Sequence, residues 1–186
     1  MIVLEGLVRL CPPPLEPPPP VDWAEAESAL GTALPGDYKR LVETYGAGVF
    51  GDTVWLLVPD SAYDDCDLHA RAAERAEILA DLWEAGEARP AGLTEAGARA
   101  LPWAFEEGSG AFLYWLVLPG RRPDGWTVLY NEGRGPLWED HDMGCVAFLE
   151  ALLCGTLQSA YFGDEEAAPV AHRFQTADAV LGEPRR

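Results

Sequence analysis

Positive charge is scarce in this sequence, which has 13 lysine and arginine residues against 31 aspartate and glutamate residues. Lys39 is its only lysine. The formal net charge of −18 at pH 7 disfavours binding to nucleic acid phosphates and to anionic lipid head groups. The same charge attracts basic partners, although an acidic surface can also serve only to keep a protein in solution. We therefore expect a protein partner, with no nucleic acid and no membrane.

Cysteine pairs and long apolar runs are also missing. The four cysteines include no C-x-x-C pair, and Cys145 and Cys154 lie nine residues apart in one helical pattern, too far for a disulfide. We therefore expect buried free thiols, which are typical of a reducing compartment. No run approaches the roughly 18 apolar residues of a membrane span, and Glu5 interrupts an N-terminus that lacks the basic region of a signal peptide. We expect a cytoplasmic protein.

Motifs of catalysis are absent as well. None of the three histidines forms H-x-x-x-H or H-E-x-x-H, and there is no G-x-S-x-G, Walker loop or dinucleotide fingerprint. The densest polar cluster is Asp64, Asp65, Asp67 and His69, which could bind a divalent cation or merely cap a helix. It lacks the glycine and the terminal glutamate of an EF-hand loop. We expect no enzyme, no cofactor and no metal, with an enzyme that uses residues 64–69 as a weaker alternative.

The apolar content, by contrast, suffices for a core, because 48% of the 186 residues are hydrophobic and seven are tryptophan. Apolar periodicity predicts helices over 68–85 and 143–153, the second with Asp142 as its N-cap, and strands over 53–58, 111–118, 126–131 and 135–139. The apolar stripe of the first helix consists of Leu68, Ala72, Ala76, Leu79 and Trp83. Helices and strands are segregated rather than alternating. This order predicts a single α+β domain with a twisted, mainly antiparallel sheet and helices packed on one face.

The two ends of the chain are less regular. Residues 12–20 read PPPLEPPPP, which favours an extended polyproline II segment or, alternatively, a ligand for SH3-like grooves. Residues 2–10 are expected to add a strand or cover an edge. Residues 159–186 show little pattern beyond an alanine-rich turn near 176–181. We divide the chain into a lead-in of residues 1–20, a domain of residues 21–158 and an extension of residues 159–186.

The most informative stretch is residues 23–50, where two short helices lead into a strand. Asp22, followed by Glu25, is typical of a helix N-cap. Pro35 suits the first turn of the second helix, whose apolar stripe is Tyr38, Leu41, Val42 and Tyr45. Gly46 then stands where a left-handed helix end favours glycine.

This stretch fits the pattern W-x-x-x-E…L-P-x-x-Y-x-x-L-x-x-x-x-G-x-G. The matching residues are Trp23, Glu27, Leu34, Pro35, Tyr38, Leu41, Gly46 and Gly48. With the later blocks around 101–118, 126–131 and 143–155, it resembles the SUKH superfamily, the Smi–Knr type domain of fungal cell-wall regulators and of many bacterial immunity proteins. The resemblance covers residues 21–158 and implies the SUKH fold.

The resemblance also implies a function without catalysis. In the bacterial branch it implies an immunity protein that caps a toxin, often a basic nuclease whose phosphate substrate an acidic surface imitates. The alternative is a regulatory or scaffold module like the fungal proteins. The binding face is expected on the open side of the sheet and its loops, at Asp60, Asp64, Asp65, Trp103, Glu106, Glu107, Asp124, Trp138 and Asp140. At least half of Trp103, Trp115, Trp126 and Trp138 are nevertheless expected in the core.

Overall fold

The computed structural model describes residues 4–133, 136–162 and 172–182. Seven antiparallel strands form one sheet in the order β6-β5-β4-β3-β2-β1-β7. The strands are β1 Gly48–Phe50, β2 Val54–Leu56, β3 Arg99–Glu106, β4 Phe112–Val117, β5 Thr127–Asn131, β6 Trp138–His141 and β7 Phe174–Thr176. The α-helices are α1 Glu5–Leu10, α2 Trp23–Leu30, α3 Gly36–Tyr45, α4 Leu68–Glu84, α5 Cys145–Leu153 and α6 Ala177–Leu181. Short 3-10 helices η1 Asp64–Cys66, η2 Ala91–Thr94 and η3 Pro123–Gly125 lie between them. The predicted α+β class is confirmed.

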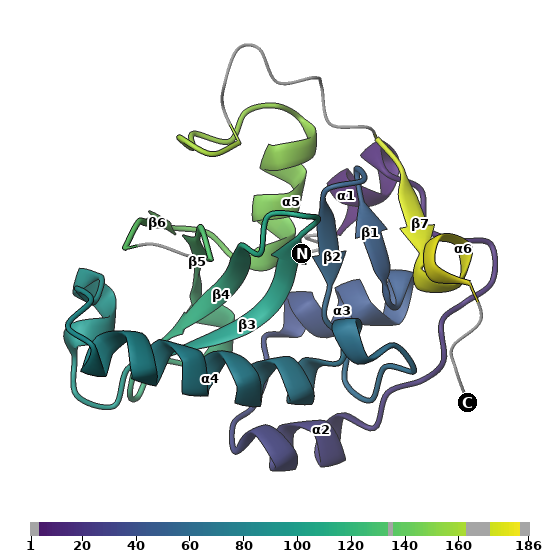
Figure 1. The fold of residues 1–186 in the computed structure, drawn as a ribbon. Helices are drawn as coiled ribbons and strands as arrows, with labels where there is room; N and C mark the ends of the chain where they lie inside the picture. The colour runs from purple at the N-terminus through teal and green to yellow at the C-terminus, as the bar shows by residue number, and fades with distance from the viewer. Residues whose placement is uncertain (1–3, 134–135, 163–171, 183–186) are drawn as a thin grey trace.

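The main core lies between the sheet and the helices α1, α3 and α5, which contact one another behind it (Figure 1). Trp115 on β4 meets the ring of Tyr38 from α3 edge-on at 4.8 Å, and Trp103 on β3 packs against Phe148 from α5. These large side chains are fully buried. Because successive residues of a strand point to opposite faces, Tyr114 points the other way, toward α4. Helix α4 therefore crosses the open face of the sheet.

Several local expectations are wrong. Residues 2–10 were expected to add a strand or cover an edge; the strand is wrong, because their described part forms helix α1, which buries Leu7 as it packs against α5. Helix α5 begins after Gly144, not Asp142, and no side chain caps it. Residues 99–106, for which no strand is expected, form β3, since a register shift between Pro102 and Ala104 accommodates the proline. The strand expected over 135–139 forms as β6 two to three residues later, and residue 135 lies outside the described residues.

Both ends of the described chain pack against the Gly-x-Gly turn after α3. Gly46 ends the helix with a φ of +71°, and a Cβ there would lie 2.6 Å from the Cβ of Pro18. A Cβ on Gly48 would lie 2.3 Å from the carbonyl oxygen of Gln175 in β7. The two glycines thus leave room for the proline-rich lead-in and for the last strand. The proline-rich lead-in and strand β7 are therefore both packed against the domain.

No helix within the described ranges is long and apolar enough to cross a membrane. All four cysteines are free. Three are buried as expected, whereas Cys154, expected inside, is exposed just beyond α5.

Candidate functional site

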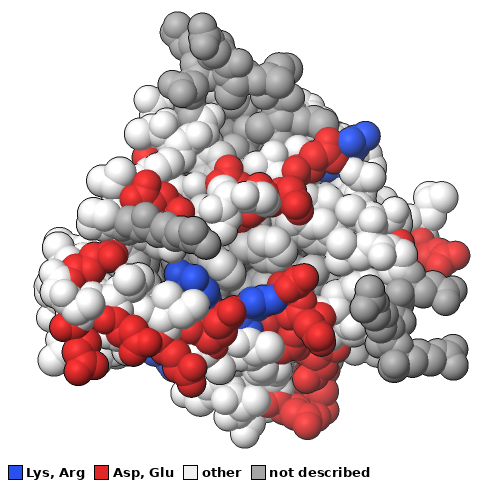
Figure 2. Space-filling view, viewed as in Figure 1, with Lys and Arg blue, Asp and Glu red and all other residues white. Residues whose placement is uncertain are grey.

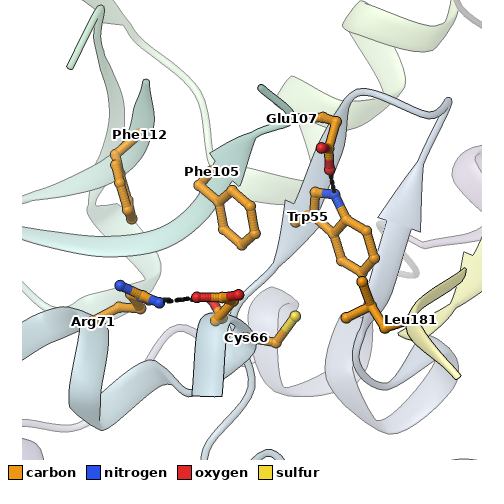
Figure 3. A pocket seen from close by; sticks show the side chains of 8 residues that line it. Trp55, Cys66, Arg71, Phe105, Glu107, Phe112 and Leu181 are labelled. Carbon is orange, nitrogen blue, oxygen red and sulfur yellow. Dashed lines mark hydrogen bonds and ion pairs between the residues drawn. The ribbon is translucent and has the colours of Figure 1, made fainter. Parts of the chain in front are cut away.

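The open face of the sheet carries two adjoining hollows, of about 300 Å³ and about 650 Å³, which share Arg71 and Phe112 in their lining. We call them together the α4 groove, because α4 forms one long wall. The first hollow lies over β2 and β3 beside η1 (Figure 3). The second continues along α4 toward Gly110 and Gly133.

Three aromatic residues from neighbouring strands form the floor of the first hollow. Trp55 on β2 is the cross-strand partner of Phe105 on β3, and Phe105 is the partner of Phe112 on β4. The rings of Trp55 and Phe105 are stacked with centroids 6.0 Å apart, and those of Phe105 and Phe112 are 5.9 Å apart. Cross-strand aromatic pairs of this kind stabilise a sheet as well as forming a surface. The floor is therefore rigid.

Acidic side chains surround this floor. Arg71 on α4 pairs with Asp65 of η1 and, at 2.6 Å, with Glu74 one turn along. Glu107, just after β3, accepts a hydrogen bond from the indole nitrogen of Trp55. Figure 2 shows basic side chains set in a hollow with acidic ones around it. The groove thus combines a flat aromatic floor with a rim of carboxylates.

Cys66, which follows Asp65 in η1, is buried and lines the first hollow. Burial, together with the nearby Asp65 carboxylate, raises the pKa of its thiol from 9.0 to about 12. A thiol with this pKa stays protonated at neutral pH and is a poor nucleophile. Its position in the groove therefore does not make it reactive.

Only part of the predicted binding set reaches this groove. Asp65 and Glu107 stand on its rim, and Asp64 is exposed beside Asp65 in η1. Glu106 instead accepts a hydrogen bond from the Tyr130 hydroxyl at 2.9 Å.

The remaining predicted contact residues lie elsewhere. Trp103 is wrong as a surface contact, because its side chain is fully buried in the core. Trp138 is half-buried against Tyr114, with ring centroids 5.4 Å apart. Asp124 accepts from the backbone N–H of Gly36 at 2.7 Å and so supports the start of α3. Asp140 is exposed on the outermost strand β6.

Sequence reasoning missed the aromatic floor of the groove and the two arginines of α4 that line it, Arg71 and Arg75. Trp55, Phe105 and Phe112 come from three different strands, so only the pairing register brings them together. Arg75 carried a usable signal, because it lies three residues after Ala72 and four before Leu79, both on the predicted apolar stripe. Ala76, which was expected on that stripe, is exposed, and Arg75 is buried instead.

The polar cluster at the start of α4 is rearranged relative to the prediction. Asp60, Asp67 and His69 bring one ligand atom each within 4.8 Å of one another, whereas Asp65 turns away to Arg71. Both carboxylate oxygens of Asp67 already accept from backbone N–H groups, of Ser61 at 3.2 Å and Ala70 at 2.7 Å. Helix capping accounts for Asp67 without a metal.

The comparisons with known proteins give no match: no family model, no curated protein and no solved structure matches this chain.

Proposed function

We propose that this protein acts by stoichiometric binding to a basic protein, as an immunity protein does when it neutralises a toxin. The observation that carries the proposal is the α4 groove, where a floor of three neighbouring aromatic rings is rimmed by Asp65, Glu74 and Glu107. Aromatic surface ringed by charge is where protein interfaces concentrate their binding energy. The motif resemblance to the bacterial SUKH proteins suggests the immunity role.

The charge of the whole chain supports the same proposal. With a net charge of −18, the protein attracts a basic partner over distances of about one Debye length, roughly 10 Å at 0.1 M salt. Such steering speeds association more than it strengthens the final complex. Carboxylates placed over a nuclease site would also occupy the positions of substrate phosphates, which prevents substrate binding without any catalytic residue in the inhibitor.

The test begins with the proteins encoded beside this gene, each expressed alone and scored for toxicity, then co-expressed with this chain. We expect one neighbour to be toxic, to bind the purified protein one-to-one, and to lose its toxicity on binding. If no neighbour is both toxic and bound, the immunity function is wrong.

A matched pair of charge reversals then locates the interface. Glu107→Lys changes the groove rim, whereas Glu77→Lys makes the same change at an exposed position on α4 that lines neither hollow. We expect Glu107→Lys to weaken binding roughly tenfold or more, mainly through slower association, and Glu77→Lys to change it much less. Equal effects of the two variants would place the interface away from the groove.

A further inference from the structure

Arg75 is a buried cation in the middle of α4. Its side chain is only 6% exposed, on the face of the helix that covers the sheet. Its Nε donates to the hydroxyl of Tyr114 at 2.9 Å, and its guanidinium lies 4.6 Å from the centre of the Phe112 ring. Arginine is rarely buried in this way unless an anion accompanies it.

No anion accompanies Arg75 among the residues that the structure describes. The two nearby carboxylates, Asp65 and Glu74, are both engaged by Arg71 one turn earlier, and no carboxylate oxygen of the described chain forms an ion pair with Arg75. Its Nη2 is buried without an acceptor. Its Nη1 likewise donates no hydrogen bond but is not a buried atom, and Arg75 lines the larger hollow. The guanidinium thus has one buried donor group without an acceptor, Nη2, and one unused donor group that is not buried, Nη1.

The larger hollow supplies an apolar wall next to this charge. Ile78, Leu82 and Phe112 line it together with Arg75, and its volume of about 650 Å³ is in the range of small-ligand pockets. Glu74 and Glu87 also line this hollow. They repel a doubly charged anion such as phosphate more strongly than a single carboxylate. The hollow therefore offers the positive charge of Arg75, which has no ion pair among the described residues, beside an apolar surface. A ligand that carries one negative charge on an apolar group matches this arrangement.

We propose that this hollow binds a carboxylate attached to an apolar group, with the carboxylate on Arg75 and the apolar group against Ile78, Leu82 and Phe112. A carboxylate can accept from the accessible Nη1 directly, and the guanidinium has to turn before the buried Nη2 can complete the planar fork that lysine cannot offer. The carboxylate would come from a small free acid or from an acidic side chain of a bound polypeptide. Binding here does not require the toxin partner proposed above.

The experiment titrates the whole protein with phenylacetate and, separately, with the neutral analogue phenylacetamide, inorganic phosphate and the peptide N-acetyl-Leu-Glu-amide. Backbone amide chemical shifts in an NMR spectrum report the binding. We expect phenylacetate or the peptide to produce saturable shifts at residues around the hollow, and phenylacetamide and phosphate to bind at least tenfold more weakly. Saturation by phenylacetate shows that a free acid suffices, and saturation by the peptide alone shows a polypeptide source.

Arg75→Met tests the role of the charge, with Arg40→Met on α3 as its matched control, because Arg40 is exposed and lines neither hollow. We expect Arg75→Met to fold, since an apolar side chain replaces a buried unpaired charge, and to lose binding roughly tenfold or more. Arg40→Met should bind as the parent does. Should Arg75→Met fail to fold, Arg75→Lys keeps the charge without the fork and is expected to bind several-fold more weakly.

Three results would overturn the proposal. They are saturation by none of the carboxylates, equal affinity for phenylacetate and phenylacetamide, and unchanged affinity in the folded Arg75 variants.

Discussion

At the residue scale, each motif residue of the first helices has a specific contact. Trp23 donates to Glu43 at 2.8 Å, and the Tyr38 hydroxyl donates to the backbone carbonyl of Leu57 at 2.5 Å, which ties α3 to the chain just after β2. Glu27 accepts from the backbone N–H of Leu34 at 2.7 Å and pairs with Lys39. Packing and hydrogen bonding therefore explain why these residue types stand at these positions.

Glu27 provides a test of this explanation. Because it satisfies the backbone N–H of Leu34 in the turn between α2 and α3, Glu27→Ala should lower the free energy of unfolding by about 1–3 kcal/mol. Glu27→Gln keeps an oxygen acceptor and loses only a partly exposed ion pair with Lys39, so it should cost about 0–1 kcal/mol. Urea denaturation of both variants measures the difference. If Glu27→Gln costs as much as Glu27→Ala, the ion pair and not the turn hydrogen bond carries the effect.

At the element scale, the sheet is completed by segments that the sequence does not mark clearly. Strand β7 pairs with β1 through Phe174, Gln175 and Thr176, and Arg173 holds Asp52 with two hydrogen bonds of 3.0 and 2.6 Å. The proline-rich lead-in lies against Gly46. The turn between α3 and β1 is thus where both ends of the described chain meet the domain.

Gly46 tests the contact with the lead-in. Gly46→Ala and the control Gly182→Ala both place alanine at a positive φ with an extended ψ, at +71° and −163° and at +78° and −176°, but only Gly46 has an atom within 4 Å of the added methyl group. This backbone region, which is open essentially only to glycine, should cost about 1–3 kcal/mol in each variant, and contact with Pro18 should add roughly 1–3 kcal/mol in Gly46→Ala. Urea unfolding of the two variants isolates this difference. Equal losses would mean that the lead-in moves aside without cost.

The accuracy of prediction differs between elements for physical reasons. Helix α4 was predicted over 68–85 and forms over Leu68–Glu84, because a long apolar period is a strong signal. Helix α1 is only six residues long, too short for the period to separate helix from strand. Strand β3 contains Pro102, which argues locally against a strand, and only the bulge beside it resolves the conflict.

The candidate site was less predictable than the fold. Its acidic rim follows from loop residues that sequence reasoning selects, such as Asp65 and Glu107. Its floor depends on the register that places Trp55, Phe105 and Phe112 side by side, and a single sequence does not specify long-range register. Trp103 was misplaced for the same reason, since composition does not say which face of the sheet it occupies.

At the scale of the whole molecule, many weakly acidic groups are buried in their protonated form. Burial raises the pKa of Cys66 from 9.0 to about 12, of Cys11 from 9.0 to about 11, and of Tyr114 from 10.0 to about 12. Arg75 partly offsets the effect of burial on Tyr114. In the unfolded chain the same groups ionise near their ordinary values. Folding is therefore coupled to proton binding at alkaline pH.

The sign of this coupling predicts alkaline destabilisation. Above about pH 9 the unfolded chain loses protons that the folded protein retains, so the free energy of unfolding falls as pH rises. Each such group contributes about 1.4 kcal/mol per pH unit until its folded pKa is reached. Stability from Cys66 is complete below pH 9.0 and is lost up to about pH 12. Growing repulsion in a chain of net charge −18 acts in the same direction.

Cys66→Ala separates the contribution of the thiol to this pH dependence from that of charge repulsion, because it removes one titrating group and leaves the surface charge unchanged. Urea unfolding of parent and variant between pH 8 and pH 10.5 should give a shallower decline for the variant, by about 1.4 kcal/mol per pH unit above pH 9. The exposed Cys154→Ala variant should decline as steeply as the parent, since its thiol is open to solvent. If the free energy of unfolding declines with pH equally steeply in the parent and in Cys66→Ala, Cys66 ionises in the folded protein as readily as in the unfolded chain. Ionisation in the folded protein requires that water reach the thiol through the groove.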